Sequence, residues 1–499
     1  MHAKVVIVGW SVTAIFALAC SANDGSVTPL APDAGLEGDA PPGSDASMTD
    51  LGDGGMPSPE AGRNEGGASG GAALWSVFAG DGAYEDVGGI AVDASGNVFM
   101  SGYFQGTVDF GGGPMTATGQ SSDAFVVKFD PSGKFLWNVR YGDGQVQVAY
   151  GIAADAQGNV IVTGFNMGTM DVGLAQPLVT AGKEDIFVLK LDGAGKALWA
   201  KGYGDTDTQS GTGVAVDPQG NIVITGSMKS TTDFGKGVLT SAGMDDMYLA
   251  GLNPSGVTQW AARYGDATEQ FGISAAFDTS GALFFTGDFD GTVDFGLGPL
   301  VSAGGYDAAL VKLDGTGKAL FAKRFGDANN QVGDQVAVDG QGDVAFSGGF
   351  EGTIDLGKGA LTAMPLGSKF LAKLDPSLNV QWAKGLGEGN VFDPTTVAVD
   401  EAGDIVVAGE FKNVIDFGLG PIAAKDGYDI FVAKYGSDGA PRWGERFGAI
   451  NDQFARSVAV TPSGNIVMGG YFLGKLGFNN GGGQTAPGNG LLYAVELSP

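Results

Sequence analysis

The sequence predicts an all-β protein, a seven-bladed β-propeller of four-stranded antiparallel blades. A unit of about 61 residues repeats seven times between residues 73 and 499. Each unit contains four short runs of strand-forming residues separated by turn residues, and no stretch of useful length shows the apolar period of a helix. Repeats of four short strands are typical of a β-propeller.

Two markers define the repeat. An aromatic residue at the centre of the fourth strand recurs at spacings of 62, 62, 61, 61, 61 and 61 residues, and a turn between the first and second strands recurs at identical spacings. Because both markers have the same spacings, the units contain almost no insertions. The aromatic residues are Trp75, Trp137, Trp199, Trp260, Phe321, Trp382 and Trp443, and the turns begin at Asp93, Asp155, Asp217, Asp278, Asp339, Asp400 and Thr461.

In the first unit, strands are expected at residues 89–92, 97–103, 124–129 and 135–140. Asp and Gly in the turns between the first pair and the last pair are suited to tight turns, because Asp caps its own turn and Gly tolerates a positive φ. The Asp-x-x-Gly-Asn turns lack the ligand spacing of calcium loops. Asp-Phe-Gly sequences also recur with the repeat, and we interpret them as turns between the second and third strands; they begin at Asp109, Asp233, Asp294 and Asp416.

The ends of the array predict a closed ring. The chain enters with a fourth-type strand at residues 73–78 that has no first three strands before it, and it leaves with a third-type strand at residues 491–497 that has no fourth strand after it. Pairing these two strands completes the last blade and removes open sheet edges.

The repeats resemble the SBBP family of bacterial β-propeller repeats over residues 73–499. The residues that carry the resemblance are the Asp-Ala-Ser-Gly-Asn-Val-Phe-Met-Ser-Gly segment at 93–102, its copies such as 217–226, and the Trp strand. The resemblance implies an extracellular or surface protein and no particular reaction.

The N-terminus resembles a bacterial lipoprotein signal. Lys4 precedes an uncharged run at residues 5–19, which is too short to span a bilayer, and the only Cys of the chain, Cys20, follows it directly. The resemblance implies a signal peptide at residues 1–19, lipidation of Cys20, and the outer membrane or cell surface as the location. A plain secretory signal cleaved near Ala19, with a secreted or periplasmic protein, is the alternative.

Residues 20–72 are expected to form a disordered tether. The segment is acidic and rich in Gly, Pro, Ala and Asp, and it lacks aromatic residues. Such a composition cannot bury enough apolar surface to offset the entropy of ordering. A flexible chain of this length has an end-to-end distance of about 40 Å.

Composition excludes several function classes. A net charge of -29 disfavours nucleic-acid binding, which depends on Lys and Arg. The only His is His2 and the only Cys is Cys20, so the propeller sequence has neither an imidazole nor a thiol for catalysis. No unit breaks the repeat with unique, convergent residues, so we expect no active site.

Candidate ligand-binding residues lie in the segments that join one blade to the next. An acidic residue recurs there, with an amide four residues later in most units. Such a ring of oxygens near a central channel could bind a cation such as calcium or a glycan, whereas turn capping and hydrogen bonding within the segment are the structural alternative. The residues are Asp81, Asp143, Asp205, Asp266, Asp327 and Glu388, with Gln147, Gln209, Gln270, Gln331 and Gln453.

These observations predict an exported, lipid-anchored, non-catalytic binding or scaffold module that takes a protein or polysaccharide ligand on one face of the propeller. We expect a monomer that contacts the membrane only through its N-terminal lipid, without nucleic acid and without a cofactor other than such a calcium ion. The alternative function is a cation-dependent enzyme that acts on carbohydrates or lactones through carboxylates on the propeller face.

Overall fold

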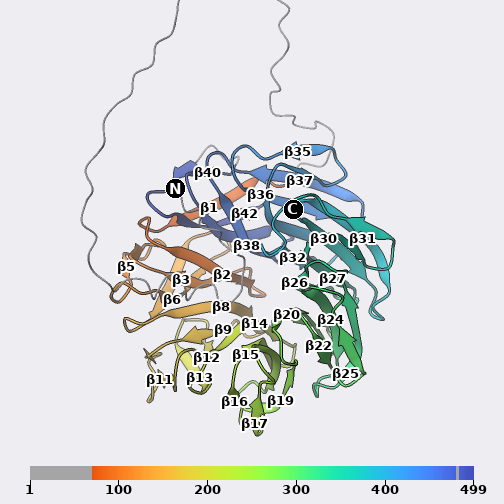
Figure 1. The fold of residues 1–499 in the computed structure, drawn as a ribbon. Helices are drawn as coiled ribbons and strands as arrows, with labels where there is room; N and C mark the ends of the chain where they lie inside the picture. Colours follow the sequence, from red (N-terminus) through yellow and green to blue (C-terminus); the bar gives the residue numbers. More distant parts are fainter. Residues whose placement is uncertain (1–69, 479–482) are drawn as a thin grey trace, which may run out of the picture. The chain divides into compact units, whose positions relative to one another are not determined.

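A computed structural model describes residues 70–478 and 483–499. Among these residues, no helix is long and apolar enough to cross a membrane. The predicted signal peptide, Cys20 and nearly all of the predicted tether lie outside the described residues. Within the described part, seven antiparallel sheets of four main strands surround a central channel, with the first strand of each sheet innermost (Figure 1).

The first four blades follow one another along the chain. Blade 1 contains β2 (Glu85–Val92), β3 (Val98–Phe104), β6 (Asp123–Phe129) and β7 (Phe135–Tyr141), and blade 2 contains β8 (Gln147–Ala154), β9 (Val160–Asn166), β12 (Asp185–Leu191) and β13 (Ala197–Tyr203). Blade 3 contains β14 (Gln209–Val216), β15 (Ile222–Met228), β18 (Asp246–Leu252) and β19 (Thr258–Tyr264), and blade 4 contains β20 (Gln270–Phe277), β21 (Leu283–Phe289), β24 (Asp307–Leu313) and β25 (Ala319–Phe325).

The remaining blades complete the ring. Blade 5 contains β26 (Gln331–Val338), β27 (Val344–Phe350), β30 (Ser368–Leu374) and β31 (Val380–Glu388), and blade 6 contains β32 (Thr396–Val399), β33 (Ile405–Phe411), β36 (Asp429–Tyr435) and β37 (Pro441–Phe447). Blade 7 contains β38 (Gln453–Val460), β39 (Ile466–Phe472), β42 (Leu491–Leu497) and β1 (Ala73–Ala79).

The predicted fold and its closure are confirmed. β1, from the start of the described chain, pairs antiparallel with β42 at its end, with Val77 opposite Ala494 (Figure 1). The innermost strands are longer than predicted, because β2 begins at Glu85 rather than at Gly89. The four additional residues continue the ladder with β3, where Glu85 pairs with Phe104, and a count of apolar residues does not detect them.

A small hairpin links the second and third strands of every unit. Asp-Phe-Gly lies at its tip, where Asp109 Oδ1 accepts a hydrogen bond from the Gly111 amide at 2.8 Å and Phe110 is buried. The turn interpretation is therefore confirmed. The hairpin strands are β4 (Thr107–Val108), β5 (Met115–Thr116), β10 (Thr169–Met170), β11 (Leu178–Val179), β16 (Thr231–Asp233), β17 (Val238–Thr240), β22 (Thr292–Asp294), β23 (Pro299–Val301), β28 (Thr353–Asp355), β29 (Ala360–Thr362), β34 (Val414–Asp416), β35 (Pro421–Ala423), β40 (Lys475–Gly477) and β41 (Gly483–Thr485).

The hydrophobic core lies between blades. One cluster joins Phe99 and Val126 of blade 1 to Phe187 and Leu189 of blade 2, all of them buried. Another cluster joins blade 7 to blade 1, so the closing contact is packed like the others. Burial of apolar surface on both sides of each sheet is the main stabilising contribution.

The recurring Trp fastens each blade to the next. Trp137 Nε1 donates a hydrogen bond to the carbonyl oxygen of Gly193 at 3.0 Å. The ring also covers Gly195, where an added Cβ would come within 2.9 Å of the indole and where φ is +83°. The repeat therefore needs Trp and Gly together, on neighbouring units.

Blades 4 and 5 vary this contact. Phe321 replaces the Trp, and Leu378 occupies the turn position that is Gly in the other units, with φ of 61°. Leu378 is buried in the cluster against which Phe321 packs. The smaller ring leaves space that the Leu side chain fills, at the cost of a strained backbone angle.

Phe321 and Leu378 are expected to be energetically coupled. Phe321→Trp alone should destabilise the fold, because the larger indole meets Leu378, and Leu378→Gly alone should leave a cavity. The double variant restores the Trp–Gly contact, so the coupling free energy should be favourable by about 1–3 kcal/mol. Thermal unfolding of the four proteins measures this coupling, and additive effects would contradict the assignment.

Candidate functional site

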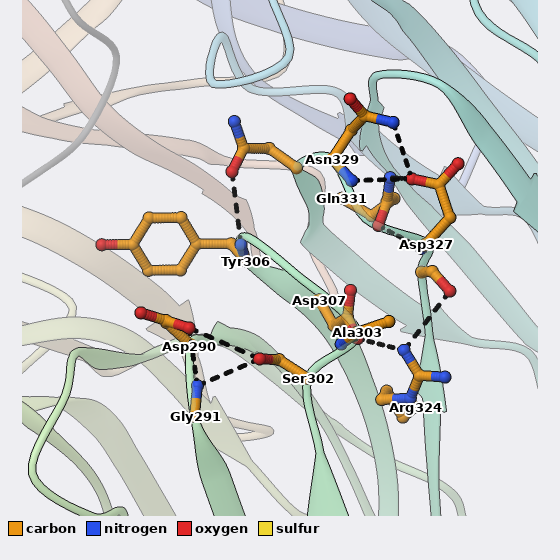
Figure 2. Close-up of polar contacts among 12 residues, drawn as sticks. Asp290, Gly291, Ser302, Ala303, Tyr306, Asp307, Arg324, Asp327, Asn329 and Gln331 are labelled. Atoms are coloured by element: carbon orange, nitrogen blue, oxygen red, sulfur yellow. Dashed lines mark hydrogen bonds and ion pairs between the residues drawn. The ribbon is translucent and has the colours of Figure 1, made fainter.

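We call the segment that joins the outermost strand of one blade to the innermost strand of the next a crossover. In each regular crossover an Asp side chain accepts hydrogen bonds from backbone amides. Asp327 Oδ1 accepts a hydrogen bond from the Asn329 amide at 2.9 Å (Figure 2), and its Oδ2 accepts one from the Thr353 amide at 2.7 Å. Thr353 begins the hairpin of the same unit, so the crossovers share a face with these hairpins. The same pair of contacts recurs at Asp81, Asp143, Asp205 and Asp266.

The predicted Gln residues begin the innermost strands and are buried. Gln331 Nε2 donates to Asp327 Oδ1 at 2.8 Å and to the carbonyl oxygen of Glu351 at 2.9 Å, while its Oε1 accepts from the Asp327 amide at 2.8 Å. Gln147, Gln209 and Gln270 make equivalent contacts to the preceding Asp. These are the turn-capping contacts of the structural alternative, and whether the Asp and Gln residues also contact a ligand stays a prediction.

Two members of the predicted set differ. Glu388 ends the lengthened strand β31, and its Oε2 accepts a hydrogen bond from Asn413 Nδ2 at 2.7 Å. Gln453, whose unit has Ala449 in place of the Asp, donates to the carbonyl oxygens of Ile450 and Asn451. The chain therefore closes these two crossovers with different hydrogen bonds.

A second set of acids, at the start of the third strands, was not predicted from the sequence. Asp307 is buried, accepts a hydrogen bond from the Ala303 amide at 2.9 Å and pairs with Arg324 on the outermost strand (Figure 2). In four units an Asp is followed by an Arg 17 residues later, and this recurring spacing would have indicated the pairs. The other pairs are Asp123 with Arg140, Asp246 with Arg263 and Asp429 with Arg446.

The channel is lined by one bulged residue from each blade. In β26 the register shifts between Gly333 and Gln335, so Asp334 is an extra residue and turns out of the ladder into the channel. Six innermost strands have such a bulge, and Thr395 occupies the equivalent place just before β32. We call this set the bulge ring: Gly88, Tyr150, Thr212, Ile273, Asp334, Thr395 and Arg456.

The bulge ring brings together residues that differ from blade to blade, whereas the expectation that there is no active site stays a prediction. Its positions have the same spacing as the Trp series, yet only Thr occurs twice among the seven. Each blade contributes one bulged residue, so no unit by itself stands out in the sequence. An alignment of the seven units would have shown this position among those that vary.

The cavity enclosed by the bulge ring has a volume of about 230 Å³. Arg456 lies at its wall, where Nε is 3.3 Å from Asp86 Oδ1 and Nη1 is 3.5 Å from Glu410 Oε1. The guanidinium also lies 5.2 Å from the centre of the Phe454 ring. The Arg456 side chain therefore contacts blades 1, 6 and 7 and joins them across the ring closure.

Asp288 and Asp334 line the same cavity from blades 4 and 5. Asp288 is only 7% exposed, and burial, followed by the charge of Asp334, raises the pKa of its carboxyl to about 8. Burial also raises the pKa of the Asp334 carboxyl, to about 7, although its Oδ2 accepts a hydrogen bond from the Thr395 amide at 2.8 Å. Both carboxyls therefore release their proton at a much higher pH than an ordinary Asp does.

Within residues 70–478 and 483–499, no group of three or more His, Cys, Asp or Glu residues is arranged to hold a metal ion. Calcium at the crossovers stays a prediction.

The comparisons with known proteins are limited in extent. No family model matches the chain, so the SBBP resemblance stays a prediction. The regulatory protein FlaEY of Caulobacter vibrioides is 29% identical over 215 residues, 41% of this chain and 21% of that protein. An uncharacterised WD repeat-containing protein of Acanthamoeba polyphaga mimivirus is 30% identical over 154 residues, 28% of this chain and 11% of that protein. The matched segments thus span about a fifth and a tenth of these relatives.

Solved structures similar to this chain include one that is described as a β-propeller. The WD40 β-propeller domain of Doa1 is 13% identical with a TM-score of 0.42, and covers 86% of this chain and 96% of that one. Sqt1 from Chaetomium thermophilum is 11% identical with a TM-score of 0.42, and covers 83% of this chain and 84% of that one. The fold is established by the strand pairing of the chain itself.

Asp288→Asn is expected to stabilise the protein at alkaline pH. Between about pH 4 and pH 8 the folded protein keeps a proton on Asp288 that the unfolded chain has released, so stability falls as the pH rises through this window. Asn removes this dependence. The variant should unfold at a temperature at least about 2 °C above wild type at pH 8.5 and at the same temperature at pH 4.

Asp307→Asn in the same blade is the matched control, because Asp307 has a cationic partner. The Asp307→Asn variant loses the ion pair with Arg324, which should destabilise the fold at pH 8.5 by roughly 1–3 kcal/mol. A lower unfolding temperature for Asp288→Asn as well would show that Asp288 has a stabilising partner.

Proposed function

We propose that this β-propeller is a non-catalytic binding module whose ligand contacts the bulge ring. The observation that carries the proposal is the contrast between repeated and varied positions. Residues that every blade needs for its geometry recur, such as the Trp, the crossover Asp and the first Gln. The bulge ring faces the cavity and differs from blade to blade, as expected of residues that fit one particular ligand.

The chemistry of the propeller supports binding over catalysis. Its sequence contains no His and no Cys, and the repeated Asp residues accept hydrogen bonds from backbone amides within their own turns. The ligand in this proposal is a protein or a polysaccharide. The crossover Asp and Gln residues would surround the rim of the same face.

A cavity-filling variant tests the site. Ile273→Trp should fill the channel and abolish binding of any ligand that enters it, because the bulged side chain projects into the cavity. Asp355→Asn, on an exposed hairpin outside the cavity, is the control. The measurement is a glycan array and a peptide array probed with wild type and both variants. A ligand that binds wild type and the Ile273→Trp variant equally would overturn the proposal.

We also propose that the protein is exported and anchored by a lipid on Cys20, as the lipoprotein-like signal and the SBBP resemblance indicate. An acidic tether after Cys20 would hold the ring away from an anionic membrane surface. Acyl chains on one Cys give a stable anchor without a membrane-spanning helix.

Cys20→Ala is expected to abolish incorporation of labelled palmitate in a bacterial host and to move the protein from the membrane to the soluble fraction. Cys20→Ser removes the same thiol with a polar isostere and should behave alike. Wild type that takes up no label, or variants that remain in the membrane fraction, would refute the lipid anchor and leave the plain secretory signal as the alternative.

A further inference from the structure

We propose that Asp288 and Asp334 bind an organic cation, an ammonium or guanidinium group, in the channel cavity. The inference rests on the proposed binding function of the bulge ring and names the chemistry of the group that enters it. Four observations on the cavity lead to this assignment.

The first observation is that Asp288 is buried without a counter-ion. Its carboxylate is 7% exposed, lines the cavity and, among the described residues, accepts a hydrogen bond only from its own backbone amide. By contrast, the buried Asp307 on the same blade has both Arg324 and a backbone amide. A buried carboxylate without such partners is costly, which makes Asp288 an acceptor that a ligand can satisfy.

The second observation is that the neighbouring cations are engaged elsewhere. Arg456 pairs with Asp86 and Glu410. Lys369 Nζ donates to the carbonyl oxygen of Asn390 at 2.6 Å and to that of Asp393. The cavity therefore offers two carboxylates from adjacent blades and, among the described residues, no cation that pairs with Asp288.

The third observation is that part of the remaining wall is apolar and aromatic. Ile273, Val332, Val336 and Phe392 line the cavity beside the two acids. The Phe392 ring meets Tyr306 edge to face, with ring centres 6.3 Å apart. Such a wall buries the carbon stem of an alkylammonium or arginine side chain, and an aromatic face attracts its charge.

The fourth observation is size. A volume of about 230 Å³ is several times what a water molecule needs and is sufficient for a guanidinium group with part of its stem. The negative net charge of the protein, -29, also raises the local concentration of cations.

Ligand affinity should depend on pH, because the cation binds the ionised acids. The groups that face Asp288 are Asp334 on β26, Glu269 on the crossover before β20, and Tyr306 before β24, whose hydroxyl donates to Glu269. Burial raises the pKa of the Asp288 carboxyl to about 8, so binding displaces a proton below this pH. Affinity should rise about tenfold per pH unit between pH 7 and pH 8, more steeply below pH 7 where Asp334 is protonated as well, and level off above pH 9.

The test is titration calorimetry of the full-length chain with L-argininamide and with n-butylamine at pH 6, 7, 8.5 and 9. Wild type should bind at least one of the two. Asp288→Asn and Asp334→Asn should each weaken binding tenfold or more, while the exposed control Asp355→Asn leaves it unchanged. Unfolding temperatures confirm that all four proteins are folded. Equal affinity in wild type and in Asp288→Asn would overturn the proposal.

A second titration, with a peptide that contains arginine, distinguishes the source of the cation. If acetyl-Gly-Arg-Gly-amide binds tenfold more tightly than L-argininamide, the cation is the side chain of a protein partner; equal affinity indicates a free small molecule. Both results support the proposal. Calcium binding that requires Asp288 and Asp334, without binding of either organic cation, would overturn it.

Failure of this inference is separable from failure of the proposed function. If neither organic cation binds, but an array ligand loses affinity in Ile273→Trp, the cavity is the binding site and only its cationic specificity is wrong. If the array ligand is also insensitive to Ile273→Trp, both proposals fail.

Discussion

The fold depends on burying both faces of every blade against its neighbours. A four-stranded sheet of seven-residue strands cannot bury enough apolar surface alone, and a row of such sheets would leave two open ends. Pairing of β1 with β42 removes the ends and places a packed cluster between blades 7 and 1. At five of the interfaces a repeated Trp and the turn Gly of the next blade reinforce the same contact, so the regular spacing of the sequence is a consequence of similar interfaces around a ring.

Polar residues divide into two groups that follow from this arrangement. The crossover Asp, the first Gln and the Asp–Arg pair satisfy backbone amides and one another, and they recur because each blade presents the same unpaired groups. The bulge ring has no task that repeats from blade to blade. Because the bulged residue leaves the ladder and points into the channel, its side chain is free to differ, and the seven blades together build an asymmetric cavity from a symmetric frame.

The charges in this cavity are unevenly compensated. Arg456 is held by acids of two blades and by the rings of Phe454 and Tyr471, which makes it part of the frame at the closure. Asp288 lies across the channel and is buried without a cation, whereas Asp334 accepts a hydrogen bond from the Thr395 amide and is influenced by the charge of Lys369. A buried acid without a counter-ion, such as Asp288, gives up stability for recognition, as binding sites commonly do, and the proposed organic cation would supply the missing counter-ion.

The sequence by itself determined the number of blades, the strand order, the closing pair of strands and the turn chemistry, because these depend on local spacing and on residues that repeat. It also identified the crossover residues, although it did not decide whether their oxygens accept hydrogen bonds within the turn or bind a ligand. Only the tertiary structure decided which residues meet in the channel. Asp288 and Asp334 come from adjacent blades and from different strand positions. A bulge shifts one residue out of the alternation of the strand, and the hydrophobic pattern of the sequence does not reveal it. Convergence of one residue per blade is a property of the closed ring, and no segment of the sequence contains it.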